Sequence, residues 1–533
     1  MTNTMTTMHF DVVRGPLRVA RRAAVALAIA IAAVSVAGAP TAWAQHHEHA
    51  GAPAAGGAPP HTASASAERK LPADATTDQT IELPGHAIHF RATAGSIPLN
   101  KADDGTLLAE IAYIAYVVPG DAPRPVTFVF NGGPGAASAY LDLGAIGPWR
   151  LPLAHFSISE PPKLMPNAES WLDFTDLVFI DPPGTGYSRI AASGDEGRKR
   201  FWSVDGDAEA LAVVIRKWIE QAGRQQSLKF IAGESYGGFR APKVAHELKD
   251  QGVGIRGLVM ISPVIDFANL STSRHMPMGW VNHLPSMAAA ALDAKGQYSR
   301  DALRDVEHYA AGDYLLDLLK GERDAAAVAR ISARVAAYTG LDPALVKRLA
   351  GRVDVPTFQR ELHRAQGLIG SSYDPNVTAY DPNPTAATTS YSDPILGGTR
   401  APITTAMTDL YQHVLNWRVD RPYELLNGEV GRNWFKGGGL RAPQVVDDLR
   451  DDLAADGKLR VLVAHGANDL VAPYFADQLL LAQLPVYGSA DRVKLAVYAG
   501  GHMFYDRDES RRALHADAAA LVAAASKPAA TGE

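Results

Sequence analysis

The chain has 533 residues, of which 47% are hydrophobic and 20% charged, and its formal net charge at pH 7 is −6. This composition is typical of a globular protein and excludes a fibrous or wholly disordered one, while the length predicts two domains or one large fold with an insertion. The slightly acidic balance, without a basic stripe, argues against a nucleic-acid partner. The absence of cysteine excludes disulfides, thiolate metal sites and a cysteine nucleophile.

Residues 1–44 carry the pattern of a signal peptide. Arginines at 14–22 precede an uncharged apolar run at 23–34, and Ala42-Trp43-Ala44 forms a small-residue cleavage site. The apolar run is shorter than the roughly 20 residues that a membrane span requires, which argues against the alternative of a membrane-anchoring helix. We therefore expect cleavage near Ala44 and export to the periplasm or the medium, with no membrane span in the mature protein. The stretch 45–69, rich in Ala, Gly, Pro, Ser and His, predicts a flexible linker.

The first part of an α/β core is expected at 70–271, where strand and helix patterns alternate from about residue 106. Short apolar runs bounded by turn residues predict strands, and apolar residues at helical spacing predict helices. Such an alternation predicts an α/β fold, with a mostly parallel sheet covered by helices on both faces. The predicted strands are 126–130, 177–180, 228–232 and 258–261, and the predicted helices are 207–221 and 239–248.

The pattern changes between 272 and 440, where we find no strand-like run and interpret the segment as a helical cap insertion. The predicted helices of this segment are 301–318, 323–338, 343–350 and 356–367. The α/β pattern then resumes, which predicts the second part of the core at 441–526 and a C-terminal tail at 527–533. Its predicted strands are 459–464 and 493–498, and its predicted helices are 474–484 and 508–525.

Gly233-Glu234-Ser235-Tyr236-Gly237 is a G-x-S-x-G sequence between a predicted strand and a predicted helix. In that context the sequence is typical of a nucleophile elbow, a tight turn that lifts the serine hydroxyl above the sheet. An ordinary loop serine is the alternative. The strand before the motif and the helix after it favour Ser235 as a catalytic nucleophile.

A serine hydroxyl needs a general base and a carboxylate that orients the base, and in this fold they follow in the order Ser, Asp, His. Asp469 and His502 each come directly after a predicted strand, where parallel sheets carry their functional groups. The glycines before His502 favour a closely packed loop. His465 and His515 are competitors that we interpret as a core histidine and a solvated helix residue.

Acyl transfer also requires donors that stabilise the developing oxyanion, each contributing roughly 3 kcal/mol. We expect one donor to be the N–H of Tyr236, the residue after the nucleophile, and the other to be the N–H of Gly133 in the glycine-rich loop after the strand 126–130. A phosphate-binding loop is the alternative for Asn131-Gly132-Gly133-Pro134-Gly135, but no Gly-Lys-Ser/Thr follows it.

Several blocks together resemble the serine carboxypeptidases, and the chain looks like a cysteine-free, bacterial-type member of that family with the α/β-hydrolase fold. The resemblance spans 131 to 503 in the order of the family. The blocks are Asn131-Gly-Gly-Pro-Gly135, Asn167-Ala-Glu-Ser-Trp171, Asp181-Pro-Pro-Gly-Thr-Gly-Tyr-Ser188, Gly233-Glu-Ser-Tyr-Gly-Gly238, Asn468-Asp469 and Gly500-Gly-His-Met503.

The resemblance implies release of single residues from peptide C-termini through an acyl-enzyme on Ser235, with His502 as base and Asp469 as orienting acid, and without a cofactor or metal. It implies oxyanion donors at Gly133 and Tyr236. It also implies that Asn131, the N–H of Gly132 and Glu234 hold the terminal carboxylate of the peptide, and that Met503 lines the pocket of the leaving residue. A carboxyl group that binds a carboxylate needs a proton, so we expect a raised pKa at Glu234 and a preference for mildly acidic pH.

The chain departs from the family at Ala145, where better-known members carry an acidic partner for the residue that corresponds to Glu234. Without like-charge repulsion we expect a smaller rise in the pKa of Glu234. Our hypothesis is that Arg150 compensates by binding the terminal carboxylate through a charge-assisted hydrogen bond. Two other functions remain open from the sequence: an esterase or acyltransferase on the same scaffold, and a catalytically inactive binding protein.

Overall fold

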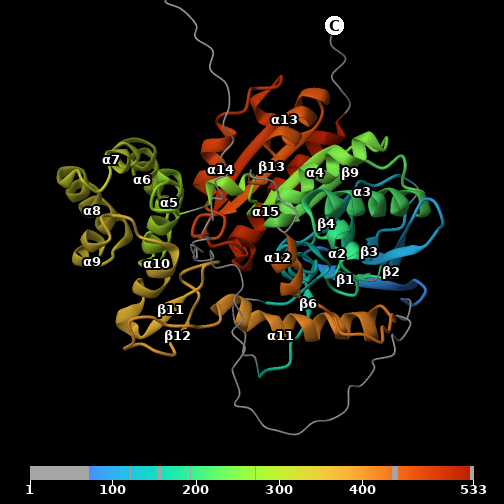
Figure 1. Ribbon diagram of the computed structural model, residues 1–533. Helices are drawn as coiled ribbons and strands as arrows, with labels where there is room; N and C mark the ends of the chain where they lie inside the picture. The colour runs from blue at the N-terminus through green and yellow to red at the C-terminus, as the bar shows by residue number, and fades with distance from the viewer. Residues whose placement is uncertain are drawn as a thin grey trace, which may run out of the picture. The chain divides into compact units, whose positions relative to one another are not determined.

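The computed structural model describes residues 71–120, 122–152, 159–192, 194–270, 272–434 and 442–527 (Figure 1). The expected signal peptide at 1–44 and linker at 45–69 lie outside these residues, as does most of the tail expected at 527–533.

Ten strands of the described ranges form one sheet, ordered β1-β2-β3-β7-β4-β9-β10-β13-β14, with β8 paired to β3. From β7 to β14 in this order, each strand runs parallel to the next, whereas β1 with β2, β2 with β3, and β3 with β7 pair antiparallel. The mostly parallel α/β sheet expected from the sequence is therefore confirmed. The strands are β1 Ala75–Leu83, β2 His86–Asn100, β3 Leu107–Val117, β4 Val126–Phe130, β7 Asp176–Ile180, β8 Arg189–Ile190, β9 Lys229–Glu234, β10 Gly257–Ile261, β13 Arg460–Gly466 and β14 Val493–Tyr498.

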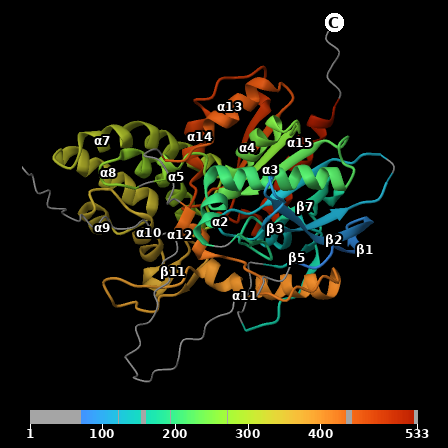
Figure 2. The same cartoon turned by 45° about the vertical axis from the view of Figure 1, so that its right-hand side comes forward.

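Hydrophobic side chains on both faces of the sheet are buried against helices. Along β4, Phe128 and Phe130 belong to one core cluster and Val129 to the other, because successive strand residues point to opposite faces. The first face packs against α3 (Val204–Gln221), α4 (Tyr236–Asp250) and α13 (Val446–Ala455). The second packs against α15 (Asp508–Ser526) and α11 (Pro394–Asp409) (Figures 1 and 2). Burial on both faces explains why the parallel strands read as continuous apolar runs.

The chain between β10 and β13 is mainly helical and has a core of its own. Side chains of α5 to α9 form a separate hydrophobic cluster, which Tyr474 and Phe475 of α14 (Tyr474–Leu481) join. The domain boundaries at 272 and 440 stay a prediction. The helices are α5 Pro277–Asp293, α6 Arg304–Tyr309, α7 Leu315–Lys320, α8 Ala325–Thr339, α9 Pro343–Arg348, α10 Val355–Glu361 and α12 Gly428–Trp434, with α11 between the last two.

Three expectations on the elements need correction. The antiparallel strands β1 and β2 lie outside the region where we expected strands, because their polar residues alternate with buried ones and leave no apolar run. The segment 272–440 does contain a strand pair, β11 (Leu368–Gly370) and β12 (Thr378–Tyr380). A π-helical turn with non-helical torsion angles at Gly312 separates α6 from α7 within the single helix expected at 301–318.

Candidate functional site

Ser235 lies between the end of β9 and the first residue of α4, in a conformation that side chains rarely adopt, with φ 59° and ψ −123°. The backbone N–H of Ser235 donates to the carbonyl oxygen of Ile261 at 2.8 Å. Gly233 and Gly237, on either side of the turn, must be glycines, because other backbone atoms lie very close to them. A Cβ on Gly233 would lie 2.1 Å from the oxygen of Gly237, and one on Gly237 would lie 2.5 Å from the oxygen of Phe130. The local structure is therefore a strained strand-to-helix turn with serine at its apex.

Asp469 and His502 form a buried pair. Nδ1 of His502 lies 2.7 Å from Oδ2 of Asp469, and both residues are almost completely shielded from solvent. The other oxygen of Asp469 accepts from the N–H groups of Val471 at 2.7 Å and Ala472 at 3.0 Å. These bonds fix the carboxylate and leave Oδ2 to orient the imidazole.

The backbone of His502 contacts the loop that follows β10, the neighbour of β9 in the sheet. The carbonyl oxygen of His502 accepts from the hydroxyl of Ser262, the first residue after β10, at 2.7 Å. Burial lowers the pKa of His502, but Asp469 and, more weakly, Glu234 outweigh that effect and raise it. No hydrogen bond in the described ranges involves Nε2 of His502, so this nitrogen has an unused lone pair or proton.

The glycine-rich loop after β4 lies directly against the start of α4. A Cβ on Gly132 would lie 2.4 Å from the nitrogen of Tyr236, and Gly133 has a positive φ of 99°. Within the described ranges, the N–H groups of Gly133 and Tyr236 donate to no protein acceptor. Two backbone donors without a protein acceptor thus lie in segments that touch, one in the glycine-rich loop and one at the first residue of α4, next to Ser235.

Glu234 is buried immediately before the serine. The amide of Asn131 donates to its Oε2, and the hydroxyl of Tyr505 donates to its Oε1 at 2.9 Å. Burial raises the pKa of Glu234 to about 7, although His502, Tyr505 and Asn131 each lower it. The pKa of Glu234 is thus raised, in the direction that the resemblance implies.

Asp506 is an acidic neighbour of Glu234 that the sequence reasoning missed. It belongs to the turn Phe504–Asp506, which packs against the turn Asp142–Ile146 containing Ala145. Its Oδ1 is shielded from solvent and has no hydrogen-bond partner in the described ranges. Burial, and then the nearby Glu234, raise the pKa of Asp506 to about 8, against the lowering effect of Arg511 and Arg150. A buried acid that stands in no recognised motif therefore lies in the turn that packs against the turn of Ala145.

Arg150 lies close to this acidic group but contacts other residues. Its Nη2 is 4.0 Å from Oδ1 of Asp508 and 4.0 Å from the sulfur of Met165. Burial lowers the pKa of Arg150, and Arg511 lowers it further. Met503, next to His502, is buried in the core cluster of the α15 face. No hydrogen bond of the described residues joins Arg150 to Glu234.

The two competing histidines have structural partners. His465 is fully buried, with Nε2 3.0 Å from Oδ2 of Asp477, as befits a core histidine. His515 packs edge-on against Phe174, and its side chain is only 22% exposed, so its interpretation as a solvated residue was wrong. His515 belongs to a helix at the surface of the protein but lies on the side of that helix that faces the core. The sequence alone did not distinguish this position from a solvent-facing one.

Arg240 of α4 is a further residue that sequence reasoning missed, and it holds the glycine-rich loop in place. It forms a buried ion pair with Asp207 of α3 and donates through Nη1 to the carbonyl oxygen of Asn131 at 2.5 Å. Its signal in the sequence is weak, because a single arginine inside a predicted helix is usually solvated.

No group of three or more His, Asp or Glu side chains in the described ranges is placed to hold a metal ion. In the same ranges, no helix has both the length and the apolar character that crossing a membrane requires.

Residues 90–302 match the family described as serine carboxypeptidase. Serine carboxypeptidase-like 28 from Arabidopsis thaliana is 28% identical over 226 residues, which cover 39% of this chain and 44% of that protein. Pheromone-processing carboxypeptidase KEX1 from Yarrowia lipolytica is 28% identical over 184 residues, which cover 34% of this chain and 28% of that protein. The chain thus spans less than half of the length of these curated relatives.

Among solved structures, that of KEX1(delta)P, a prohormone-processing carboxypeptidase from Saccharomyces cerevisiae, is similar with a TM-score of 0.53. The sequence identity is 15%, and the likeness covers 80% of this chain and 91% of that chain. At this identity the likeness is one of fold. Together with the sheet order, it confirms the α/β-hydrolase fold expected from the sequence.

Proposed function

We propose that this chain, a member of the serine carboxypeptidase family through its segment 90–302, is a serine-type carboxypeptidase that removes residues from peptide C-termini. The observation that carries the proposal is the buried Asp469–His502 pair beside an elbow in which Ser235 has strained backbone angles. Such a pair supplies the base and the orienting carboxylate that a serine hydroxyl needs to attack an amide.

In the proposed reaction, Nε2 of His502 takes the proton of the Ser235 hydroxyl as Oγ bonds to the carbonyl carbon of the scissile amide. Asp469 holds Nδ1–H and stabilises the imidazolium that forms. The N–H groups of Gly133 and Tyr236 stabilise the negative charge on the carbonyl oxygen. The imidazolium then protonates the leaving nitrogen, the C–N bond breaks, and the terminal residue departs from the acyl-enzyme. A water molecule, deprotonated by His502, hydrolyses the ester and restores Ser235.

Exopeptidase specificity requires recognition of the terminal carboxylate of the peptide. In our proposal the amide of Asn131, the N–H of Gly132 and protonated Glu234 donate hydrogen bonds to that carboxylate, and Met503 contacts the leaving side chain. The rise in the pKa of Glu234 to about 7 supports this role, because a protonated carboxyl group donates where an ionised one repels. Arg150 remains our candidate for an additional cation at the edge of this subsite.

The proposal includes the organisation of the chain. A signal peptide at 1–44 would direct export, and the helical segment 272–440 would act as a cap over the site. Peptides are the proposed substrates.

Mass analysis of peptide products over time tests the proposed activity. We expect a ladder that loses one C-terminal residue per step with the wild-type protein, and no ladder with Ser235→Ala. Internal cuts, or turnover of esters alone, would contradict the proposal.

Arg150→Ala is expected to raise KM for free-terminus peptides and to leave KM for C-terminally amidated peptides unchanged. Full activity of Arg150→Ala on free-terminus peptides would remove the role of Arg150 and leave the remainder intact.

A further inference from the structure

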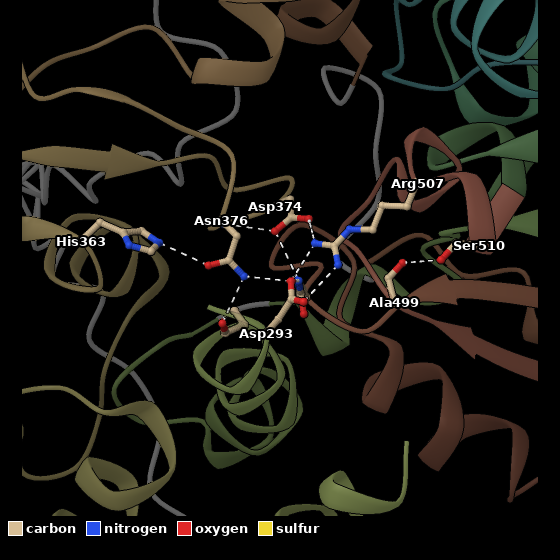
Figure 3. Close-up of polar contacts among 9 residues, drawn as sticks. Asp293, His363, Asp374, Asn376, Ala499, Arg507 and Ser510 are labelled. Atoms are coloured by element: carbon tan, nitrogen blue, oxygen red, sulfur yellow. Dashed lines mark hydrogen bonds and ion pairs between the residues drawn. The ribbon is translucent and has the colours of Figure 1, made fainter. Parts of the chain in front are cut away.

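A charged cluster joins the helical segment to the loops of Asp469 and His502. We define it as Asp293, Asp374, Asn376, Asn468 and Arg507, all of which except Asn468 are labelled in Figure 3. Asp293 is the last residue of α5, and Asp374 and Asn376 lie in the loop between β11 and β12. Asn468 directly precedes Asp469, and Arg507 follows the turn that begins after His502. Four segments far apart in the sequence therefore meet in one polar contact.

Arg507 is the only cation among these five residues and binds both carboxylates. Its Nη1 and Nη2 donate to the two oxygens of Asp293 at 3.1 and 2.7 Å, and Nη2 also donates to Oδ2 of Asp374 at 3.1 Å. The guanidinium reaches between the two acids in Figure 3. The planar guanidinium donates through two nitrogens to the two oxygens of Asp293. This paired geometry fixes the orientation of the arginine as well as balancing the negative charges.

Asn468 links the same carboxylates to the catalytic aspartate. Its Nδ2 donates to Oδ2 of Asp293 at 2.7 Å and to Oδ1 of Asp374 at 3.3 Å. Its backbone N–H donates to the carbonyl oxygen of Gly500 at 2.8 Å, so the loop of Asp469 is bound to the loop of His502.

The loop 371–376 also touches the catalytic histidine directly. The carbonyl oxygen of Tyr373 accepts from the backbone N–H of His502 at 2.6 Å, and the Tyr373 ring meets the imidazole edge-on, with centroids 5.2 Å apart. A Cβ on Gly501 would lie 1.9 Å from that same carbonyl oxygen. The loop is thus seated against His502 with no space between them.

The charge balance of the cluster depends on Arg507. Asp374 is buried, and burial raises its pKa while Arg507 lowers it. Without the guanidinium, the carboxylates of Asp293 and Asp374 would face one another with only amide donors between them. Like charges in that position repel, which weakens the contact of the loop 371–376 with α5.

We propose that Arg507 is a positioning residue, which holds the loop 371–376 against His502 by binding Asp293 and Asp374 and so sets the place of the imidazole relative to Ser235. The inference rests on the proposed serine hydrolase function. It makes the helical segment part of the catalytic framework, in addition to any contact that it makes with substrate.

The test compares Arg507→Met with Arg507→Met/Asp374→Asn, with kinetics normalised to the concentration of serine that a phosphonylating reagent titrates. Arg507→Met should lower kcat about 100-fold with little change in KM, because an ångström-scale misplacement of a base has an effect of that order. The double variant should recover at least about tenfold of the loss, since it removes the repelling carboxylate. Arg330→Met, which breaks the ion pair of a half-exposed arginine with the buried Asp317 of α7, is the matched control and should keep wild-type kcat.

The pH dependence of kcat separates positioning from stability alone. If the imidazole drifts from Asp469, burial dominates and the pKa of His502 falls, so the acid limb of kcat should move to lower pH in Arg507→Met. The inference would be overturned if Arg507→Met lowered the melting temperature but kept wild-type kcat per titrated serine and the wild-type position of the acid limb. Absence of both labelling and peptide cleavage in the wild-type protein would instead overturn the proposed function.

Discussion

Glu234 and His502 are neighbouring side chains for which the proposed reaction requires opposite protonation states. Glu234 must keep its proton to accept a carboxylate, whereas His502 must have lost its proton to act as a base. Burial raises the pKa of Glu234 to about 7, and Asp469 keeps the pKa of His502 above its ordinary value in spite of burial. The two groups also act on one another, so the productive form exists in a limited range near neutral pH.

The Glu234→Gln variant tests this arrangement on the alkaline side. In the wild-type protein, KM for free-terminus peptides should rise with pH above about 7, approaching roughly tenfold per pH unit, because the ionised carboxylate repels the substrate. Glutamine stays neutral, so KM in Glu234→Gln should be flat from pH 6 to pH 8.5. Peptide amides, which carry no terminal carboxylate, serve as the control and should show no alkaline limb in KM in either protein. A wild-type KM that is independent of pH would contradict the role of Glu234.

Sequence motifs identified candidate residues where the motif itself requires a particular local geometry. They failed for residues that come close to the site only when the chain folds. Ser235 and Gly133 stand in glycine-rich motifs whose geometry requires small residues, and the structure has the strained angles and close approaches that follow. Asp506 and Arg507 stand in no motif. They acquire their neighbours because a short turn after His502 packs against segments more than a hundred positions away, which a single sequence does not reveal.

At the scale of elements, the parallel strands were predictable because burial on both faces makes them continuously apolar. The antiparallel strands β1 and β2 at one side of the sheet were not, since alternating polar residues in an antiparallel ribbon resemble a loop in composition. The three-residue strands β11 and β12 are too short to carry any periodicity, although their connecting loop contacts His502. Short elements are therefore the hardest to predict, even where, as here, they contact a residue of the candidate site.

The buried contact between helices α3 and α4 gives a prediction at this scale. Arg240→Met leaves Asp207 buried without its partner and frees the carbonyl oxygen of Asn131, so we expect a loss of about 3–5 kcal/mol in the free energy of unfolding. Urea denaturation of the purified variant measures the change. Arg334→Met, which removes a half-exposed ion pair with Asp305, is the control and should cost less than about 1 kcal/mol. A similar loss in both variants would show that burial of the Asp207 pair is unimportant.

At the scale of the whole molecule, several buried acids give stability a pH dependence of definite sign. The pKa of Glu234 rises from 4.5 to about 7, and that of Asp506 from 3.8 to about 8. Between the unfolded and folded values, the folded protein binds protons that the unfolded chain has released. The free energy of unfolding therefore falls as pH rises through this range, by roughly 1.4 kcal/mol per pH unit for each group that binds one proton more in the folded state.

Urea midpoints at pH 5, 6.5 and 8 test this expectation. The wild-type protein should be most resistant at pH 5 and least resistant at pH 8. The variant Glu234→Gln/Asp506→Asn should lose the part of that difference that these two side chains contribute, because neither titrates any longer, whereas burial still raises the pKa of Asp142 and that of Asp181. Equal wild-type midpoints at the three pH values would mean that these carboxyl groups ionise in the folded protein as they do in water.

The sheet places β10 next to β13, although the long helical segment separates these strands along the chain. During translation, Ser235 is therefore made long before the strands that carry Asp469 and His502. In the proposed reaction, a nascent chain that ends before β13 has the nucleophile without its base, and pairing of such distant strands is an intrinsically slow step of folding. Hydrolytic activity would thus arise only after the segment of His502 has been made and has joined the sheet, so a chain released before that point would cleave no peptide.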